Sequence, residues 1–352
     1  MFRSTMDTTC QQDHAHRKSE STGVADPAAN RYNIYVDPWD HQKLTWKSLG
    51  PEDGALVRPD GLGYPVRAGV VRFLATQNPA DEWTLRRMGI TRAPCGSFQD
   101  PTSVESFGFQ WTWDNTPRTD EDLLWRVATR FNLTPSDFAG KRVLDAGCGA
   151  GAQSMFLVRS GAIVSAIDLS SAIDSAARIS DLKSTSLAQG DIAHLPFADG
   201  TFDIVYCEGV LQHAQATEPI LAEFFRILKP GGLLLATHYV QPKGLPRIAR
   251  WKLQEWIRRQ AQKVPRDWLF LSSGIAAAIA LTPGLGWVLR KSIVPSNDKM
   301  PSLKATWSNC YDSYGHHEFQ RIIPPDEFVN SVRKAGFIHG DTSSDGLVRV
   351  TK

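Results

Sequence analysis

The sequence predicts an α/β protein built on a doubly wound, mostly parallel sheet, and three observations lead to this class. Short β-type runs alternate with helical segments in the second half of the chain. The first run ends in a glycine-rich loop at 147–151, and the second ends in an acidic residue, Asp168. Five central strands are expected, at residues 142–146, 163–167, 185–189, 203–207 and 233–237. The short connections between them imply helices on both faces of the sheet.

Length and composition limit the classes of protein that the chain can represent. Its 352 residues suffice for one elaborated domain or two small ones, and a formal charge of +2 provides no global basic field for nucleic acid. The five cysteines, at positions 10, 95, 148, 207 and 310, are scattered and include no Cys-x-x-Cys pair. This pattern is typical of a reduced cytosolic protein without a disulfide framework or a metal site.

Three segments are expected before the main α/β domain. Residues 1–30 are polar and lack the apolar stretch of a secretory signal, so we expect a disordered tail. Residues 31–80 favour a small β module, because turn and strand signals alternate over 60–74. Residues 81–137 are expected to form a helical lead-in with a dense aromatic cluster at 106–113.

The main α/β domain is expected to occupy residues 138–352 and to end with two further strands. Residues 336–339 and 347–350 favour this final pair. The helix before the pair, at 325–332, carries Asp326 near its positive amino end. With the five central strands, the pair makes a seven-stranded sheet.

An insertion is expected at residues 241–318, and its charge differs from that of the whole chain. Residues 243–291 contain ten Lys or Arg against two acidic residues, a net charge of +8. Within this segment, residues 268–289 form an uncharged stretch of 22 residues, which is long enough for a membrane span. Its serines, glycines and proline argue against a span. A lid over the site is the favoured interpretation, and contact with a membrane surface is the alternative.

The glycine loop and two carboxylates indicate the kind of ligand. Gly147, Gly149 and Gly151 let the backbone pass close beneath a ligand, because no Cβ intervenes. Asp145, just before the loop, would repel a pyrophosphate and attract a cationic ammonium group. Asp168 can accept hydrogen bonds from both hydroxyls of a ribose. A nucleoside with an amino-acid tail meets these conditions, and S-adenosylmethionine is such a compound.

In these features the chain resembles the class I S-adenosylmethionine-dependent methyltransferases of the type 11 branch. The similarity extends beyond the glycine loop to residues 189–203, 204–213 and 227–236, which follow in the family's order. The resemblance implies the Rossmann-like methyltransferase fold, in which the last strand runs antiparallel to the others.

The β module resembles part of the small zinc-ribbon domain of methyltransferase activators. No cysteine lies between residues 11 and 94, so the zinc of that domain is not expected here. An ordinary β-hairpin appendage is the alternative interpretation.

The resemblance implies a cofactor site for S-adenosylmethionine at the carboxyl ends of the strands. The predicted residues are Asp145, Gly147, Gly149, Gly151, Asp168, Leu169, Asp191, Ile192 and Glu208. Asp145 would favour the cationic end of the cofactor, and Asp168 would hold the ribose hydroxyls. Leu169 and Ile192 would pack on two sides of the adenine, whose amino group would donate to Asp191.

Acceptor-side residues are expected after the fourth and fifth strands, where substrates enter such sheets. Glu208, His213, His238 and Tyr239 lie there. His213 and His238 are candidate catalytic bases, since histidine titrates near neutrality, although an isolated histidine after a strand also occurs as a packing residue.

Two further segments are similar to parts of related sequences that cover the site. The stretch at 107–111 is similar to one that lies over the cofactor pocket, with an aromatic core as the alternative. Residues 309–317 are similar to one that closes over the acceptor, with a turn packed on the insertion as the alternative.

The absence of two motifs narrows the class of acceptor. The fourth strand ends in Cys207-Glu208-Gly209 and lacks the Asn-Pro-Pro-Tyr motif of enzymes that methylate planar amides or exocyclic amines. Cys207 also lacks the preceding proline of cytosine-C5 enzymes. We therefore expect in-line methyl transfer to a small-molecule or lipid-linked acceptor. RNA remains an alternative acceptor only because the insertion is locally basic.

Two other functions remain as alternatives. An NAD-dependent oxidoreductase is one, because Gly147-x-Gly149-x-x-Ala152 satisfies the loose dinucleotide fingerprint. A non-catalytic cofactor-binding or membrane-docking module is the other. The expected location is cytoplasmic, either free or at the inner face of a membrane.

Overall fold

The computed structural model describes residues 31–75, 78–95, 101–114, 118–240, 242, 244–282, 286, 302–314, 322–343 and 346–352. The tail expected at 1–30 lies outside these residues. The strands are β1 Thr45–Ser48, β2 Gly54–Val57, β3 Leu62–Arg67, β4 Val70–Arg72, β5 Thr91–Arg92, β6 Arg142–Ala146, β7 Ile163–Asp168, β8 Ser186–Gln189, β9 Phe202–Cys207, β10 Leu228–Thr237, β11 His339–Thr342 and β12 Leu347–Thr351.

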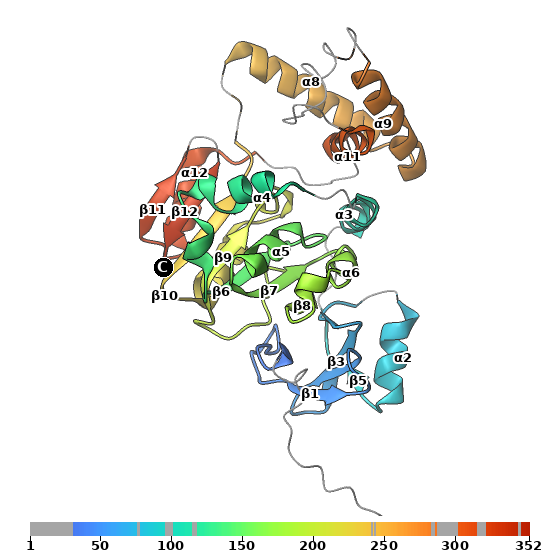
Figure 1. Ribbon diagram of the computed structural model, residues 1–352, viewed down its shortest axis with the longest axis vertical. Coiled ribbons are helices and arrows are strands. Elements are labelled where there is room, and N and C mark those ends of the chain that lie inside the picture. The colour runs from blue at the N-terminus through green and yellow to red at the C-terminus, as the bar shows by residue number, and fades with distance from the viewer. Residues whose placement is uncertain are drawn as a thin grey trace, which may run out of the picture.

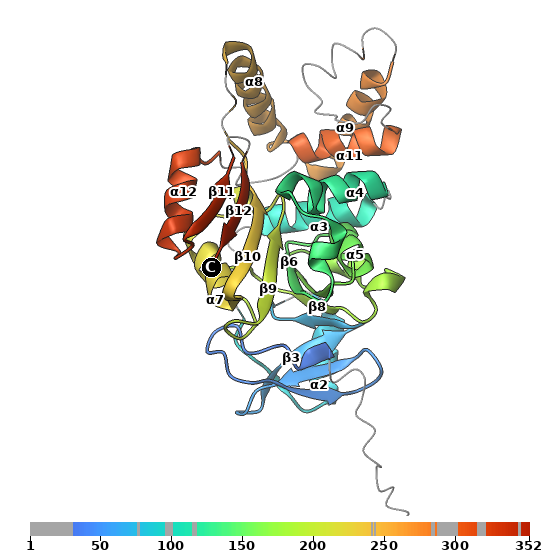
Figure 2. The ribbon, with the colours of Figure 1, turned by 60° about the vertical axis from the view of Figure 1, so that its left-hand side comes forward.

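Helices cover both faces of the sheet, and further helices lie beyond one end of its central strands (Figure 1). They are α2 Pro79–Arg87, α3 Pro101–Trp113, α4 Asp120–Val127, α5 Ala152–Arg159, α6 Ile173–Ala176, α7 Glu218–Ile227, α8 Leu245–Ala261, α9 Arg266–Ala280, α11 Leu303–Tyr314 and α12 Pro325–Lys334. Four short 3-10 helices are η1 Thr129–Phe131, η2 Pro135–Phe138, η3 Ser180–Leu182 and η4 Leu211–His213. Helices α4 and α5 lie on one face of the sheet, and α7 and α12 lie on the other (Figure 2).

Seven strands reproduce the expected sheet. Strands β8, β7, β6, β9 and β10 are parallel neighbours in that order. Strand β12 pairs antiparallel with β10 and carries β11 on its outer side. The predicted doubly wound α/β fold with an antiparallel last strand is therefore confirmed. Two boundaries differ clearly. Strand β10 begins at Leu228 instead of residue 233, because Leu228 already pairs with Phe202 before an irregularity in the register. Strand β11 begins at His339, where the strand expected at 336–339 ends, because Gly336 with φ +107° belongs to a turn.

The amino-terminal β module continues the main sheet instead of standing apart from it. Strand β4 pairs in parallel with β8, with Arg72 opposite Gln189. The Arg72 side chain is 1% exposed, donates to Gln189 and forms an ion pair with Asp174 on α6. The boundary expected at residue 80 falls within α2, and this helix packs on β3. Elements on both sides of that boundary thus belong to one module.

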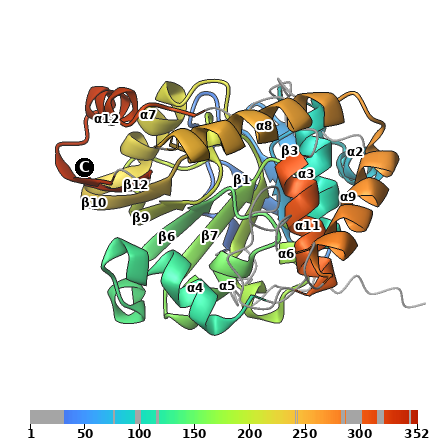
Figure 3. The same cartoon turned by 90° about the horizontal axis from the view of Figure 1, so that it is seen from above.

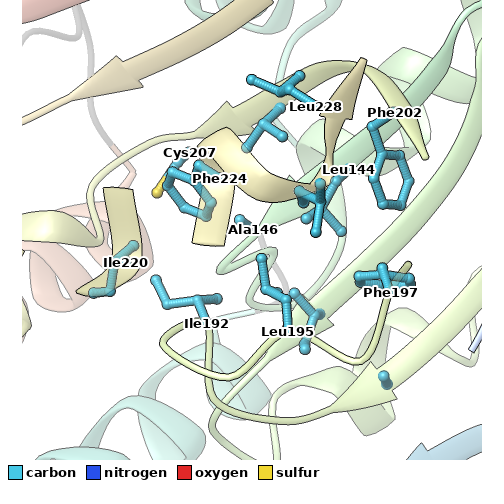
Figure 4. Packing of buried hydrophobic residues seen from close by; sticks show 14 of the residues in the cluster. Leu144, Ala146, Ile192, Leu195, Phe197, Phe202, Cys207, Ile220, Phe224 and Leu228 are labelled. Carbon is cyan, nitrogen blue, oxygen red and sulfur yellow. The ribbon is translucent and has the colours of Figure 1, made fainter. Parts of the chain in front are cut away.

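The core fills both faces of the sheet because alternate residues of each strand point in opposite directions. On β6, Leu144 belongs to the larger cluster, and Val143 belongs to a second cluster on the other face. The larger cluster gathers side chains from the central strands and α7 (Figure 4). It reaches the amino-terminal module, where the ring centroid of Tyr35 lies 5.4 Å from that of Phe197.

The insertion forms a layer of helices beyond the main sheet, with α11 beside α3 (Figures 1 and 3). Helix α9 buries Leu269, Ser273 and Ala277 on its inner face and packs against α11. Gly274 permits this approach, because a Cβ there would lie 2.6 Å from the indole of Trp307. Among the described residues, no helix has the length and apolarity needed to cross a membrane.

Candidate active site

The loop after β6 turns tightly through three glycines. Gly147, Gly149 and Gly151 have φ angles of +84°, +53° and +88°, a region that other residues rarely adopt. A Cβ on Gly147 would lie 2.2 Å from the side chain of Val210, and one on Gly151 would lie 2.8 Å from the Ala176 Cβ. The loop at the carboxyl end of β6 therefore has a backbone without side chains at these three positions, and we call it the glycine cradle. A cofactor can approach such a backbone closely.

Asp168 lies at the end of β7, beside this loop. Its Oδ2 accepts the Gly149 amide at 2.8 Å, and its Oδ1 accepts the amide and hydroxyl of Ser170 at 2.8 and 2.6 Å. A carboxylate offers about four lone-pair positions, so one on Oδ2 remains for a ribose hydroxyl. A second position becomes available when the Ser170 hydroxyl rotates away. Burial raises the pKa of the Asp168 carboxyl, although these hydrogen bonds oppose the shift.

Asp145 is buried beneath the glycine loop. It is 2% exposed, and its Oδ2 accepts the Ser154 hydroxyl at 2.6 Å. Burial raises the pKa of Asp145 to about 7; the bond from Ser154 opposes the shift, and the negative charges of Glu208 and Asp168 add to it. A cationic group next to Asp145 would favour its ionised form. The carboxyl that the sequence assigns to the cofactor's ammonium group therefore lies where a cation is favoured.

The residues predicted on the adenine side lie after β7 and β8. The Asp191 Oδ1 accepts the Ala193 amide at 2.8 Å and shapes the turn after β8. Ile192 is 9% exposed and joins the larger core cluster. Leu169 is half-buried, and its carbonyl oxygen accepts from Gln189 at 3.2 Å. These residues share the carboxyl edge of the sheet with the glycine loop.

Glu208 follows β9 and is held by four side chains. It forms ion pairs with Arg126 at 3.0 Å and Arg130 at 2.8 Å. It also accepts from the Tyr206 hydroxyl at 2.6 Å and from Gln153 at 3.2 Å. Burial opposes ionisation of Glu208, but the two arginines outweigh it, so its pKa is lowered. The carboxylate ties α4 and η1 to β9, and its role toward the cofactor stays a prediction.

Helix α3 lies over the glycine loop. A Cβ on Gly149 would be 3.8 Å from the indole ring of Trp111. Gly108 lies so close to the turn after β7 that a Cβ there would be 2.5 Å from the Ser171 hydroxyl. The aromatic stretch that the sequence indicates as a cover thus lies directly beside the loop that it would cover.

The two candidate bases have different surroundings. His238 is 5% exposed, its ring stacks on Phe328 at 4.0 Å, and burial lowers its pKa. These contacts are those of a packing residue. His213 is half-buried, with its ring centroid 4.9 Å from that of Phe107 and 6.1 Å from that of Tyr239. His213 therefore faces α3, and of the two histidines it is the better placed to act as a base.

Sequence reasoning missed polar residues that gather around His213. Gln110 on α3 and Gln212 on η4 are each 1% exposed and hydrogen-bond to Asp312 and Tyr239, respectively. Asp312 belongs to α11 and interacts electrostatically with His213. In the sequence, Gln110 lies inside the aromatic stretch at 106–113, Asp312 lies inside the closing segment expected at 309–317, and Gln212 precedes His213, but no pattern marks any of the three as a site residue. Of the expected closing segment at 309–317, residues 315–317 lie outside the described residues.

Comparison with known proteins identifies similarity to methyltransferases. A family model described as a methyltransferase domain matches residues 144–236. The demethylmenaquinone methyltransferase of Thermobifida fusca (strain YX) is 34% identical over 168 residues, which cover 44% of this chain and 68% of that protein. The ubiquinone biosynthesis O-methyltransferase of Xanthomonas oryzae pv. oryzae (strain PXO99A) is 40% identical over 104 residues, 28% of this chain and 43% of that protein.

A solved structure gives a further comparison. Phosphoethanolamine N-methyltransferase 2 of Haemonchus contortus, in complex with S-adenosyl-L-methionine, matches with a TM-score of 0.41 and 18% identity. The match covers 71% of this chain and 47% of that one. Of three curated relatives, the matched segment covers 52%, 38% and 43% of the length.

Proposed function

Because the chain belongs to the class I S-adenosylmethionine-dependent methyltransferases, we propose that it transfers a methyl group to a small-molecule or lipid-linked acceptor held between His213 and α3. The observation that carries this proposal is the bare glycine cradle with Asp145 beneath it and Asp168 beside it. The names of its relatives support the acceptor class, since they refer to demethylmenaquinone and to ubiquinone biosynthesis. We carry over this class and no individual acceptor.

S-adenosylmethionine, when bound, supplies a methyl carbon that is already activated for displacement, so the protein must mainly align the partners and exclude water. Asp145 would hold the ammonium group, and Asp168 would hold a ribose hydroxyl through its remaining lone pair. Leu169, Asp191 and Ile192 would enclose the adenine. Helix α3 would keep water from the glycine loop.

Calorimetric titration with S-adenosylhomocysteine, with NAD as the comparison ligand, tests the cofactor assignment. We expect a micromolar dissociation constant for S-adenosylhomocysteine and no heat with NAD, because Asp145 would repel a pyrophosphate. Binding of NAD alone would overturn the proposal in favour of an oxidoreductase. Binding of neither would favour a non-catalytic module.

A membrane surface is the second part of the proposal, and the exposed face of α9 supports it. Trp268, Leu271 and Ile275 are 66%, 50% and 56% exposed and lie on one side of the helix, opposite the side that packs on α11. The segment 243–291, to which α9 belongs, carries a net charge of +8, and Arg259 on the preceding helix α8 is 70% exposed. An exposed apolar helix face in a basic segment fits the interface of an anionic bilayer.

Vesicle co-sedimentation tests this contact. We expect binding to phosphatidylglycerol vesicles that weakens with added salt, and little binding to phosphatidylcholine vesicles. Ile275→Ser should weaken binding about tenfold, since it removes one apolar anchor. The matched control is Ile338→Ser, which changes a 75% exposed isoleucine outside the insertion. Equal loss in both variants, or salt-insensitive pelleting, would contradict a specific contact through α9.

A further inference from the structure

Two buried glutamines present polar atoms to the region around His213. The Oε1 atoms of Gln110 and Gln212 are buried and have no hydrogen-bond partner among the residues that the structure describes. Buried polar atoms in folded proteins are normally paired, and an unpaired acceptor can take a hydrogen bond from a bound group or a water. Gln110 belongs to α3, whose Phe107 ring contacts that of His213, and Gln212 is the residue before His213 on η4.

The hydrogen bonds of each amide limit its orientation. Burial raises the pKa of the Asp312 carboxyl, whereas the bond from the Gln110 side chain lowers it, as a donor to a carboxylate does, so the Gln110 nitrogen points toward Asp312. Its oxygen is therefore the atom left over. The Gln212 side chain bonds to the Tyr239 hydroxyl, which can donate or accept. Either orientation of that amide leaves one polar atom without a partner among the described residues.

The insertion carries Asp312 to this position. The residue before it, Tyr311, is 1% exposed, and its hydroxyl lies 3.2 Å from the Ser106 hydroxyl on α3. The Tyr311 ring centroid lies 5.9 Å from that of Phe109 on the same helix. These contacts fix α11 on α3, so the Asp312 carboxyl faces Gln110 and His213.

We propose that Gln110, Gln212, His213 and Asp312 form a subsite for an acceptor that carries a hydroxyl group, with His213 as the base and Asp312 as its positioning residue. This inference rests on the proposed function and specifies its substrate class. Two hydrogen-bond acceptors belong to this group, the Asp312 carboxyl and the Gln110 oxygen. A carboxylate head group would be repelled there, and a group without a donor would leave the Gln110 oxygen unpaired.

The chemistry of the step balances without a further reactant. The acceptor hydroxyl gives its proton to His213 while its oxygen forms the bond to the methyl carbon. The carbon–sulfur bond breaks, and its electron pair stays on the sulfur of the departing S-adenosylhomocysteine. Asp312 stabilises the imidazolium that results. Arg118 and Asp114 also act on Asp312, with charges of opposite sign. Water then takes the proton from His213.

Three probes with the same alkyl chain and different head groups test the substrate class: 4-decylcatechol, decylamine and decanoate. Each is incubated with the full chain and methyl-labelled S-adenosylmethionine. We expect labelled product from the catechol only. Preferential methylation of the amine or the carboxylate, or of none of the three, would overturn the inference.

Variants then separate the roles of the residues. Gln110→Met should raise the KM for the catechol about tenfold, because it removes the accepting oxygen at similar volume. Asp312→Asn should lower kcat about a hundredfold with KM little changed, and Asp312→Glu should restore part of the loss, which a purely structural role would not allow. Asp267→Asn, an exposed carboxylate on α9, is the matched control and should behave as wild type.

Calorimetric binding of S-adenosylhomocysteine is measured for every variant and shows that the cofactor site is folded. If Gln110→Met fails this check, Gln212→Met tests the same subsite. Unchanged KM in the glutamine variant that folds, or unchanged kcat in Asp312→Asn, would refute the subsite. Absence of cofactor binding by the wild type would instead refute the proposed function.

Discussion

Asp145→Asn should remove a pH dependence from cofactor binding. Burial raises the pKa of Asp145 to about 7 from an ordinary value of 3.8. The cofactor's ammonium group is attracted to the ionised carboxylate, so binding below pH 7 must displace a proton. By linkage, the dissociation constant of the wild type should rise about tenfold per pH unit below 7, which is about thirtyfold between pH 8 and 5.5. The variant should bind weakly at every pH, with no such slope.

The same pKa shift affects the stability of the ligand-free protein. A rise from 3.8 to about 7 corresponds to about 4 kcal/mol, to order of magnitude. The folded state keeps a proton that the unfolded state loses between these values. The contribution to the free energy of unfolding is therefore fully present below about pH 4 and is lost as pH rises to 7. Above pH 7, ligand-free Asp145→Asn should be more stable than wild type by up to about 4 kcal/mol.

Two measurements check this reasoning. Calorimetry with S-adenosylhomocysteine in buffers of different ionisation enthalpy counts the protons released on binding at each pH. Urea unfolding at the same pH values gives the stability of each ligand-free protein. Asp326→Asn, in the exposed first turn of α12, serves as the control for a carboxylate remote from the site. A wild-type dissociation constant that does not change with pH, or an equal slope in the Asn variant, would refute the role of Asp145.

Three other substitutions test the geometry of the site and of the sheet. Asp168→Ala should raise the dissociation constant of S-adenosylhomocysteine about a hundredfold, and unchanged affinity in calorimetry would remove Asp168 from the site. Gly147→Ala places a Cβ 2.2 Å from Val210 and should lower the thermal unfolding midpoint; adding Val210→Ala should recover part of this loss, and no recovery would show another cause. Arg72→Met removes the buried partner of Asp174 and should lower the free energy of unfolding, measured by urea titration, by about 2 kcal/mol. An unchanged urea midpoint would contradict the role of Arg72 in joining the module to the sheet.

The central strands and the cofactor loop were predictable because their signals are local. A few consecutive residues specify each of these features: strand β6, the three glycines that follow it, and the acidic residue that ends β7. The attachment of the amino-terminal module was not predictable in this way. Strand β4 has three residues, and its partner β8 lies far along the chain, so no local pattern specifies the pairing.

The acceptor side shows the same limit more clearly. Asp312 meets Gln110 and His213 because α11 packs on α3, and helical periodicity within either segment cannot reveal that contact. Glu208 is a related case. Its place after β9 suggested a cofactor contact, whereas the ion pairs with Arg126 and Arg130 depend on how α4 and η1 dock on the sheet. A linear pattern shows where a strand ends, but it does not show which side chains from other elements lie there.

The pairing of β4 with β8 also decides where the sheet presents open backbone. All four residues of β8 are buried, and without its neighbour this strand would expose a row of unpaired amide and carbonyl groups. Such edges recruit strands from other molecules and lead to aggregation. The module moves the outer edge to β1, a four-residue strand with an exposed Lys47, which is a poor template for another chain. A shortened chain that begins after β4 would therefore self-associate through β8, even with every residue of the cofactor site retained.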